Sequence, residues 1–221
     1  MNNSIANILK SSIETVDWAD KVAGLVQTAN VRVKNGDSIS DKSYPISCNV
    51  TYEACIKGTY DELAPNSKKK SIMYFEDRGV SFVEHSGNKM KFRSSLRLVC
   101  WLNLCLIDDS CGVSGSYVID IIKKLPSKGF AASGFYSILI TSISQVERSV
   151  DIFSKYTYNE QATQYLMYPF DYFALDLEIE FIIPCISGTP VPEVEPEPGD
   201  SITFDSMEVT FDDETITWDA I

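Results

Sequence analysis

Residues 168–184 read YPFDYFALDLEIEFIIP, and this stretch decides how the rest of the chain is interpreted. Its residues alternate between an apolar set, Phe173, Leu175, Leu177, Ile179 and Phe181, and a mostly acidic set, Ala174, Asp176, Glu178 and Glu180. Successive side chains of a β-strand point to opposite faces of a sheet, whereas a helix would scatter the apolar set around its axis. The pattern therefore predicts a long strand with one buried face, and we expect it to close a sheet.

A β-meander is predicted upstream of this strand. The segments 71–76 (SIMYFE) and 80–85 (VSFVEH) flank Asp77–Gly79, a short loop whose glycine can take a positive φ, and this favours a hairpin. A second turn is predicted at Ser86–Asn88, after which residues 90–106 alternate again. The meander is the clearest local structure in the sequence.

The alternation over 90–106 is interrupted at Ser94–Ser95, where we expect a bulge or a bend. Lys91, Arg93 and Arg97 share the other face of this segment. We interpret this basic stripe as a solvent face or as the partner of acids on the 172–183 strand. Contact with a phosphate backbone is the less favoured alternative, because the protein is acidic.

Two amphipathic helices are predicted. Residues 4–27 carry apolar residues at helical spacing, with a bend or break expected at Trp18 or Gly24. A second helix is predicted to start at a cap on Ser114 or Ser116, and Val118, Ile119, Ile122 and Leu125 are expected to face inward. With a further strand, FYSILITSIS, the order predicts an α+β fold: a mainly antiparallel sheet with a β-meander, packed by an N-terminal and a central helix, plus an extended C-terminal arm.

The composition changes near the C-terminus. Residues 1–186 are predicted to form the α+β body, and the Pro/Glu-rich segment 187–200 is predicted to be an extended spacer. Residues 201–221 form an acidic arm with short β-like patches, too few to fold alone. The arm's apolar side chains need a surface, either on their own body or on a neighbouring subunit, and the candidate partner-contact residues are Phe204, Val209, Phe211, Ile216 and Trp218.

The charge of the protein is concentrated in this C-terminal part. The formal net charge is -12, and residues 187–221 hold ten acids and no Lys or Arg. The remaining residues hold 19 bases and 21 acids, so the body is nearly neutral. A strongly acidic protein is repelled by nucleic-acid backbones, which disfavours sequence-independent DNA binding. The segment is either a solubilising tail or an arm that meets a basic surface.

The sequence lacks a catalytic, cofactor-binding or metal-binding signature, and we expect none of these sites. Gly112–Ser116 resembles a nucleophile elbow, but Ser116 replaces the last glycine and the single His85 precedes Ser114. The six cysteines include no C-x-x-C pair, so we expect structural thiols in a reducing compartment and not a zinc site or disulfides. The absence of a long apolar run and of a secretory start predicts a cytosolic protein without a membrane span.

The element order resembles that of the head-to-tail connector and tail-terminator proteins of tailed bacteriophages. The resemblance is carried by YFEDRGVSFVEH, by MKFRSSLRLVCWLN and by YPFDYFALDLEIEF, where Y-P-[FY]-D-Y leads into an alternating strand, and it covers about residues 1–186. It implies a non-enzymatic virion protein that forms a homo-oligomeric ring in the phage neck, joins the portal side to the tail and lines the DNA passage. Its partners would be copies of itself and neighbouring portal, neck or tail proteins, and DNA would pass without specific binding.

A second hypothesis is that the chain is a non-viral cytosolic interaction module that recruits one partner through its acidic C-terminal arm. The two hypotheses differ in assembly state, since the first requires rings in the virion, assembled in the host cytoplasm, and the second a soluble monomer. The Pro/Glu spacer and the arm depart from the pattern of the resemblance.

Overall fold

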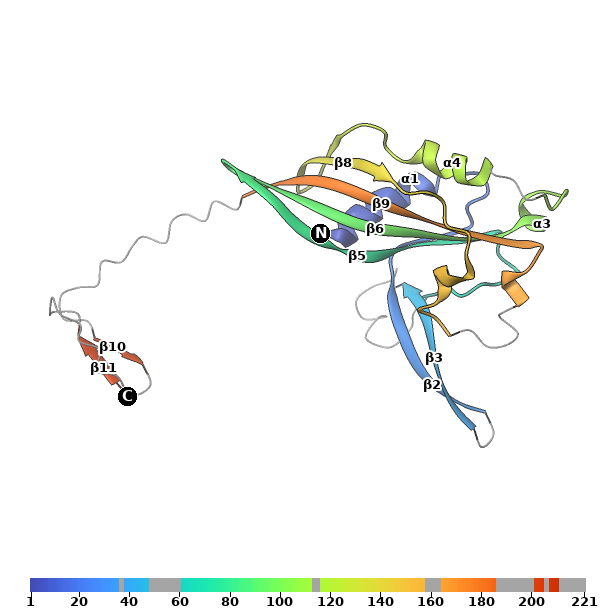
Figure 1. The fold of residues 1–221 in the computed structure, drawn as a ribbon, viewed down its shortest axis with the longest axis horizontal. Helices are drawn as coiled ribbons and strands as arrows, with labels where there is room; N and C mark the ends of the chain where they lie inside the picture. The colour runs from blue at the N-terminus through green and yellow to red at the C-terminus, as the bar shows by residue number, and fades with distance from the viewer. Residues whose placement is uncertain are drawn as a thin grey trace. The chain divides into compact units, whose positions relative to one another are not determined.

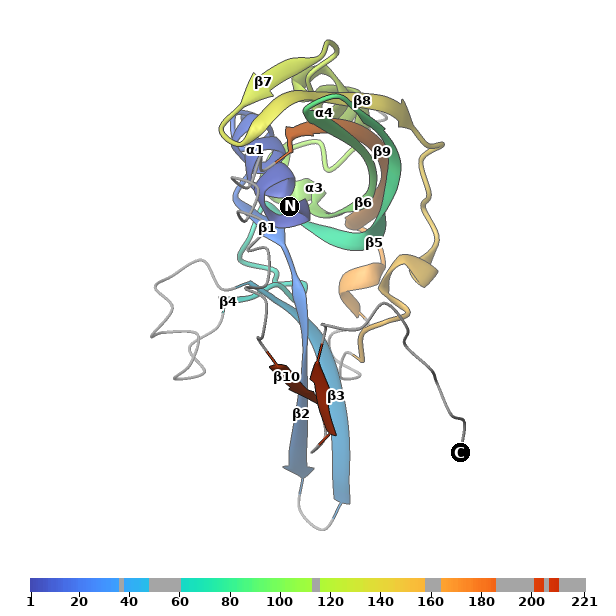
Figure 2. The same cartoon turned by 90° about the vertical axis from the view of Figure 1, so that its left-hand side faces the viewer.

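A curled sheet of six strands, in the order β1-β5-β6-β9-β8-β7, forms the centre of the body (Figures 1 and 2). Its strands are β1 (Lys21–Leu25), β5 (Ser71–Ser86), β6 (Lys89–Asn103), β7 (Phe130–Ala132), β8 (Phe135–Ile143) and β9 (Phe170–Pro184). β1 runs parallel to β5, and the other neighbours are antiparallel. The fold class expected from the sequence, α+β with a mainly antiparallel sheet, is confirmed.

This computed structural model describes residues 1–35, 38–47, 61–112, 116–157, 164–185, 201–204 and 207–210. The chain divides into two units, Met1–Pro184 and Cys185–Ile221, and each is described by itself. The helical elements of the first unit are α1 (Asn2–Ile13), α3 (Leu104–Ile107), α4 (Ser116–Lys124) and the 3-10 turns η1 (Val150–Phe153) and η2 (Gln164–Leu166).

β9 has the predicted alternation, and its place in the sheet explains the length of that alternation. Its apolar set, Phe173 to Phe181 at alternate positions, is fully buried. The strand pairs with β6 along its whole length, from Lys89 opposite Pro184 to Asn103 opposite Phe170, and with β8 on its other side. The expectation that this strand closes the sheet is therefore wrong, because β9 lies inside it.

Both faces of the sheet bury apolar side chains, but to different extents. On one face, α1 and α4 cover a large core that includes Leu98, Leu175 and the unpaired Cys100, as expected for a small apolar residue (Figure 2). On the other face, Tyr74, Trp101 and residues of η1 form a smaller cluster near one end of the sheet. The rest of that second face carries charged side chains, which form the first candidate surface below.

The predicted helix over residues 4–27 is wrong in its second half. α1 ends at Ile13, and residues 21–25 form β1, with Lys21 opposite Ile72 and Val22 opposite Met73 of β5. The apolar residues of 21–25 are spaced as in a helix, but hydrogen bonds to β5 and burial of Val22 favour a strand. A Cβ at Gly24 would overlap the end of the Asn7 side chain on α1, so strand and helix approach closely here and Asn7 would have to move to admit a larger residue.

The prediction of a hairpin turn at Asp77–Gly79 is also wrong, because β5 continues through these residues to Ser86. The register shifts between Asp77 and Val80, where two β5 residues oppose the single residue Ser95, so this is a bulge, and Gly79 adopts a φ of 112°. The bulge expected at Ser94–Ser95 therefore occurs there, with the extra residue on β5. The Asn2 side chain supports it by donating to Asp77 Oδ1 and accepting from Ser94 Oγ, both at 2.7 Å.

A separate hairpin extends from the sheet, formed by β2 (Gln27–Asn35) and β3 (Ser38–Ser47), with the short β4 (Asp61–Glu62) beside β3 (Figure 1). Most of the polar stretch NGDSISDKS, residues 35–43, is part of β3. In the second unit, β10 (Ser201–Phe204) and β11 (Met207–Thr210) pair antiparallel.

Candidate functional site

The basic stripe of β6 pairs with the acids of β9, as the sequence predicted. Arg97 is directly opposite Asp176, and Arg93 is directly opposite Glu180. The Arg97 Nε atom lies 3.0 Å from Asp176 Oδ1, and Arg93 Nη2 lies 2.9 Å from Glu180 Oε1. Lys91 Nζ also lies 2.9 Å from Glu180. We call this row of paired charges on β6 and β9 the charge ladder.

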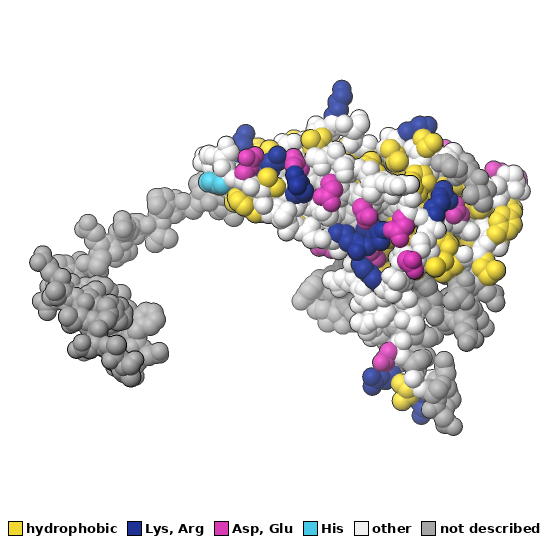
Figure 3. All heavy atoms as spheres, viewed as in Figure 1, with side chains coloured by type: hydrophobic (Ala, Val, Ile, Leu, Met, Phe, Trp, Pro, Cys, Tyr) yellow, Lys and Arg dark blue, Asp and Glu magenta, His cyan; other side chains and the backbone are white. Residues whose placement is uncertain are grey.

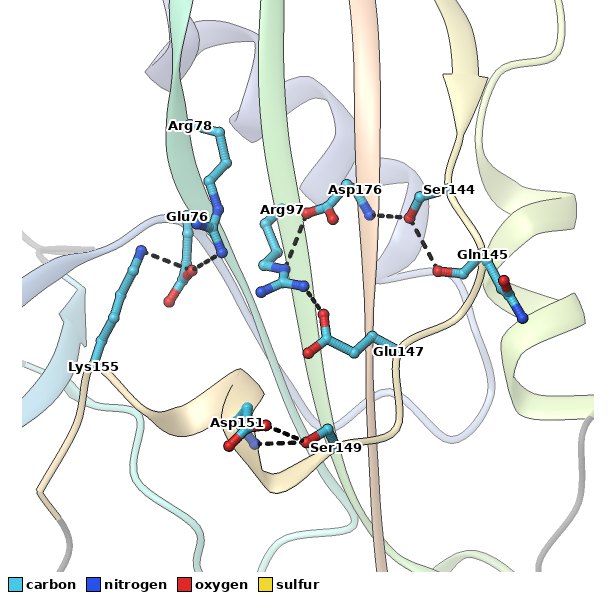
Figure 4. Close-up of polar contacts among 10 residues, drawn as sticks. All are labelled: Glu76, Arg78, Arg97, Ser144, Gln145, Glu147, Ser149, Asp151, Lys155 and Asp176. Carbon is cyan, nitrogen blue, oxygen red and sulfur yellow. Dashed lines mark hydrogen bonds and ion pairs between the residues drawn. The ribbon is translucent and has the colours of Figure 1, made fainter.

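The charge ladder continues to the loop after β8. Arg97 forms a second ion pair with Glu147, so its guanidinium joins β6, β9 and that loop (Figure 4). Ser95 Oγ donates to Glu178 at 2.6 Å. Hydrogen bonds from Arg93 and Lys91 lower the pKa of the Glu180 carboxyl group. Because these cations already have carboxylate partners, the ladder is a poor site for a phosphate backbone.

A buried carboxylate lies beside the ladder on β5. Glu76 is 3% exposed, and its oxygens lie 3.0 Å from Lys155 Nζ and 2.8 Å from the Tyr156 hydroxyl group, which donates to it. Arg78 Nη2 is 3.6 Å from the same carboxylate (Figure 4). Sequence reasoning missed this cluster, although Glu76 shares a strand face with the apolar Ile72 and Tyr74. A carboxylate at such a position needs buried partners.

The second candidate surface is an aromatic row that crosses the sheet. Phe82 of β5 is opposite Phe92 of β6, which is opposite Phe181 of β9. The ring centroids are 5.5 Å apart at both steps, and Phe135 continues the row at 5.6 Å from Phe181. Phe181 is fully buried, whereas Phe82 is 58% exposed, so the row starts in the core and ends at the surface.

The row ends at an open strand edge. β1 pairs with β5 only from Ile72 to Phe75, so within the described residues the outer half of β5 has β6 on one side and no strand on the other. Val80 and Val83 on this half are exposed together with Phe82. We call residues 78–86 the open β5 edge. A long exposed apolar edge strand is a template for pairing with another chain.

The third candidate surface is the outer face of α4, and it corrects a prediction. Ile119 and Ile122 were expected to face inward, but they are 52% and 38% exposed. The buried residues of this region are Tyr117, Val118, Ile121 and Leu125. Tyr117 packs edge-to-face on Trp18, and this contact helps to fix which side of the helix faces the core. The apolar residues cover more than half of the helix circumference, so the sequence left open which of them face the core.

The predicted partner-contact residues are only partly within the described chain. The β10–β11 pairing includes the backbone of Phe204 and Val209, opposite Met207 and Ile202. Phe211, Ile216 and Trp218 lie outside the described residues, as do Ser114 and the whole spacer, residues 187–200. The contact proposed for these residues stays a prediction.

The cysteines differ from expectation in one respect. Cys105 at α3 and Cys111 form a disulfide, with Cα atoms 4.2 Å apart. The prediction of unpaired thiols is therefore wrong for this pair, which no C-x-x-C spacing indicates. α3 is a single short turn, and it returns the chain close to its starting point. Cys100 is unpaired, and burial raises its pKa well above the usual value. Cys48 and Cys55 lie outside the described residues.

Sites for small ligands are poorly represented. Among the described residues, no group of three or more His, Cys, Asp or Glu side chains is placed to hold a metal ion. A hollow of about 430 Å³ on the β2–β3 hairpin is lined by Asn30, Arg32 and Asp41, and Arg32 and Asp41 form an ion pair. None of the helices in the described ranges is long and apolar enough to cross a membrane.

Comparison of the chain with known protein families, with curated proteins and with solved structures finds no match. The candidate surfaces are therefore interpreted from their own chemistry. Figure 3 shows acidic and basic side chains intermixed over the visible face of the body, without a continuous field of one sign. Paired charges, an open apolar strand edge and an uncovered helix face suit contacts with other proteins better than contacts with a small substrate.

Proposed function

We propose that this protein is a structural component of a tailed-phage virion that assembles with copies of itself into a ring at the head-to-tail junction. In this role it joins the portal side to the tail, contacts neighbouring neck proteins and lines the passage for DNA. It performs no catalysis. The proposal rests on the resemblance in element order and on the open β5 edge, and the second of these carries the argument for assembly.

The open β5 edge supports self-assembly because of what it leaves exposed. It offers backbone hydrogen-bonding groups and the end of the aromatic row in one place. In a monomer, both would face water, and Phe82 would contribute little of the roughly 1.5–3 kcal/mol that burying such a side chain provides. A neighbouring strand would satisfy the backbone and cover the ring at the same time.

The opposite edge of the sheet supports a ring in preference to a two-fold dimer. There, the short β7 pairs only near the start of β8, and Leu139 of β8 is exposed. The two edges differ in sequence, so contact between the β5 edge of one copy and the β8 edge of the next would be head to tail. Head-to-tail contacts produce closed rings when the rotation between subunits closes.

The charge distribution fits a DNA passage. The basic side chains of the charge ladder have acidic partners, and the whole chain has a net charge of -12. The cations of the charge ladder are already paired, so this face would gain little from counterion release, and DNA passing along it would not be held.

The experiment is light scattering after size-exclusion chromatography, together with negative-stain images of the full chain. We expect rings, and we expect Phe82→Ser combined with Val80→Ser to abolish them without changing the unfolding transition. Met167→Ser, which changes an equally exposed apolar residue away from this edge, should leave the rings intact. A wild-type chain that stays monomeric at its highest soluble concentration would contradict the proposal and favour the single-partner interaction module.

A further inference from the structure

The exposed side of α4 carries two isoleucines, Ile119 and Ile122, next to its polar residues Ser116, Lys123 and Lys124. Ile119, Ile122 and Lys123 follow the i, i+3, i+4 spacing, so they form one stripe along the helix. This stripe lies away from the side of α4 that is buried against the body. Amphipathic surface helices carry polar residues on their outer side, so two exposed isoleucines one turn apart indicate a contact that the body does not provide.

Basic side chains surround this apolar stripe. Lys123 and Lys124 are in the last turn of α4, and Lys128 follows in the next loop, all three exposed. In the part of the chain that the structure describes, no carboxylate forms an ion pair with any of them. Figure 3 shows both hydrophobic and basic side chains at the surface over α4. The surface therefore suits a partner that is both apolar and acidic.

The helix dipole accounts for only part of this arrangement. Lysines in the last turn interact favourably with the negative end of the helix dipole, which explains Lys123 and Lys124 in an isolated subunit. It does not explain Ile119 and Ile122, which gain nothing from the dipole. We call Ile119 and Ile122, together with Lys123, Lys124 and Lys128, the α4 outer face.

The C-terminal segment has the complementary chemistry. Residues 187–221 hold ten acids and no bases. The β10–β11 register pairs Ile202 with Val209 and Phe204 with Met207, and all four of these residues are apolar. A two-stranded hairpin is marginally stable in water and needs a surface on which to pack.

We propose that the α4 outer face receives the acidic C-terminal segment, residues 201–221, of a neighbouring copy of this protein. The open β5 edge is a less suitable receiver for an acidic segment, because its one Arg, Arg78, lies 3.6 Å from the Glu76 carboxylate and it also carries the acid Glu84. This inference rests on the proposed self-assembly and adds to it the surface on which the arm of one subunit docks.

The place where the arm leaves the body favours a neighbour. β9 ends at Pro184, opposite Lys89 and so next to the β5–β6 turn, whereas α4 lies over the other half of the sheet (Figure 1). A Pro-rich spacer such as 187–200 reaches roughly 40 Å when extended. To dock on its own α4, the spacer would have to turn back toward the other half of the sheet, which restricts its conformations.

The first experiment is carboxylate–amine cross-linking of the full chain, using an equal mixture of unlabelled and ¹⁵N-labelled protein. We expect mass spectrometry to find links between Lys123, Lys124 or Lys128 and acids of residues 205–219, including links that join a labelled to an unlabelled chain. The Lys69–Asp20 ion pair, at 3.0 Å, provides an internal link that should form in every sample. Links confined to single chains, or none in this region while Lys69–Asp20 reacts, would overturn the inference.

The second experiment changes the apolar stripe while keeping the lysines. Ile119→Ser with Ile122→Ser should lower the yield of these links about tenfold, because two apolar contacts are lost. Val150→Ser is the matched control, since Val150 is 53% exposed and lies on η1. It should leave the yield unchanged. An unchanged yield in the double isoleucine variant would contradict the proposed surface.

The third experiment exchanges the charges. Lys123→Glu, Lys124→Glu and Lys128→Glu together should speed chymotryptic cleavage within residues 201–221 about tenfold, and adding Asp212→Lys, Asp213→Lys and Glu214→Lys should restore protection. A helix-stabilising role of the lysines alone would give no such recovery. If rings form but neither the links nor the recovery occurs, the docking surface is refuted and the proposed ring stands. If no rings form, the proposed function itself fails.

Discussion

Arg97 of β6 lies directly opposite Asp176 of β9, and its Nε atom is 3.0 Å from the Asp176 carboxylate. The same guanidinium pairs with Glu147 from the loop after β8, so one cation holds three segments that are distant in sequence. The Arg97 side chain is 12% exposed, whereas the side chain of Arg93, on the same face of the same strand, is 51% exposed. This contrast in burial gives a direct test of what the charge ladder contributes to stability.

We expect Arg97→Met to lower the free energy of unfolding by about 1–3 kcal/mol, because it leaves two carboxylates close together without a cation. Arg93→Met should cost less than about 1 kcal/mol, since exposed ion pairs contribute little. Urea unfolding of the full chain, followed by circular dichroism, measures both. Equal losses in the two variants would show that burial of Arg97 is irrelevant.

The Glu76 cluster should be energetically coupled. The Tyr156 hydroxyl group donates to the buried carboxylate at 2.8 Å, and a hydrogen bond to a charged group is worth about 1.5–3 kcal/mol. In a double-mutant cycle of Glu76→Gln and Tyr156→Phe, we expect a coupling energy of at least about 1 kcal/mol. Additive single effects would mean that the contact contributes no stability of its own.

Glu180 should make stability dependent on pH in the acid range. Hydrogen bonds from Arg93 and Lys91 lower its pKa in the folded protein below the ordinary value of 4.5. A lowered folded-state pKa means that the carboxylate stabilises the protein above the unfolded-state pKa, and that this contribution is lost as pH falls through the folded-state pKa. The difference in unfolding midpoint between wild type and Glu180→Gln should therefore be largest at neutral pH and vanish in strong acid. A difference independent of pH would contradict this assignment.

The Cys105–Cys111 disulfide should stabilise the folded state modestly. Closing so short a loop restricts the unfolded chain by about 2 kcal/mol in the chain-entropy model. We expect Cys105→Ser with Cys111→Ser to lower the free energy of unfolding by about this amount, and reducing agent to have the same effect on wild type but none on the variant. Cys100→Ala serves as the unpaired control, which should respond to reducing agent as wild type does.

The sequence determined the strand faces because side chains of an extended chain alternate with a fixed period of two. That period alone assigns Phe173 to Phe181 to the core, and Lys91, Arg93 and Arg97 to the face opposite the core. The signs of the charges made pairing with the acids of β9 one of two interpretations of the basic stripe, the other being a solvent-exposed face. The register, which matches Arg97 with Asp176 and Arg93 with Glu180, came from the structure.

Tertiary contacts decided the points where local patterns were ambiguous. Residues 21–25 could form a helix or a strand, and hydrogen bonds to β5 select the strand. Asp77–Gly79 could form a turn or a bulge, and the continuation of β6 beside Val80 selects the bulge. The closeness of Cys105 and Cys111 depends on α3, a four-residue helix that no pattern in the sequence predicted.

Tertiary contacts also decided which face of α4 is buried, and so which residues of this helix can contact a partner. Its apolar residues, Tyr117, Val118, Ile119, Ile121 and Ile122, cover more than half of the helix circumference, so its periodicity could not show whether Ile119 or Ile121 enters the core. Packing of Tyr117 on Trp18 and burial of Ile121 settle this, and they leave Ile119 and Ile122 at the surface. Helical spacing defines which residues share a face, but only the neighbours of a helix determine which face is buried.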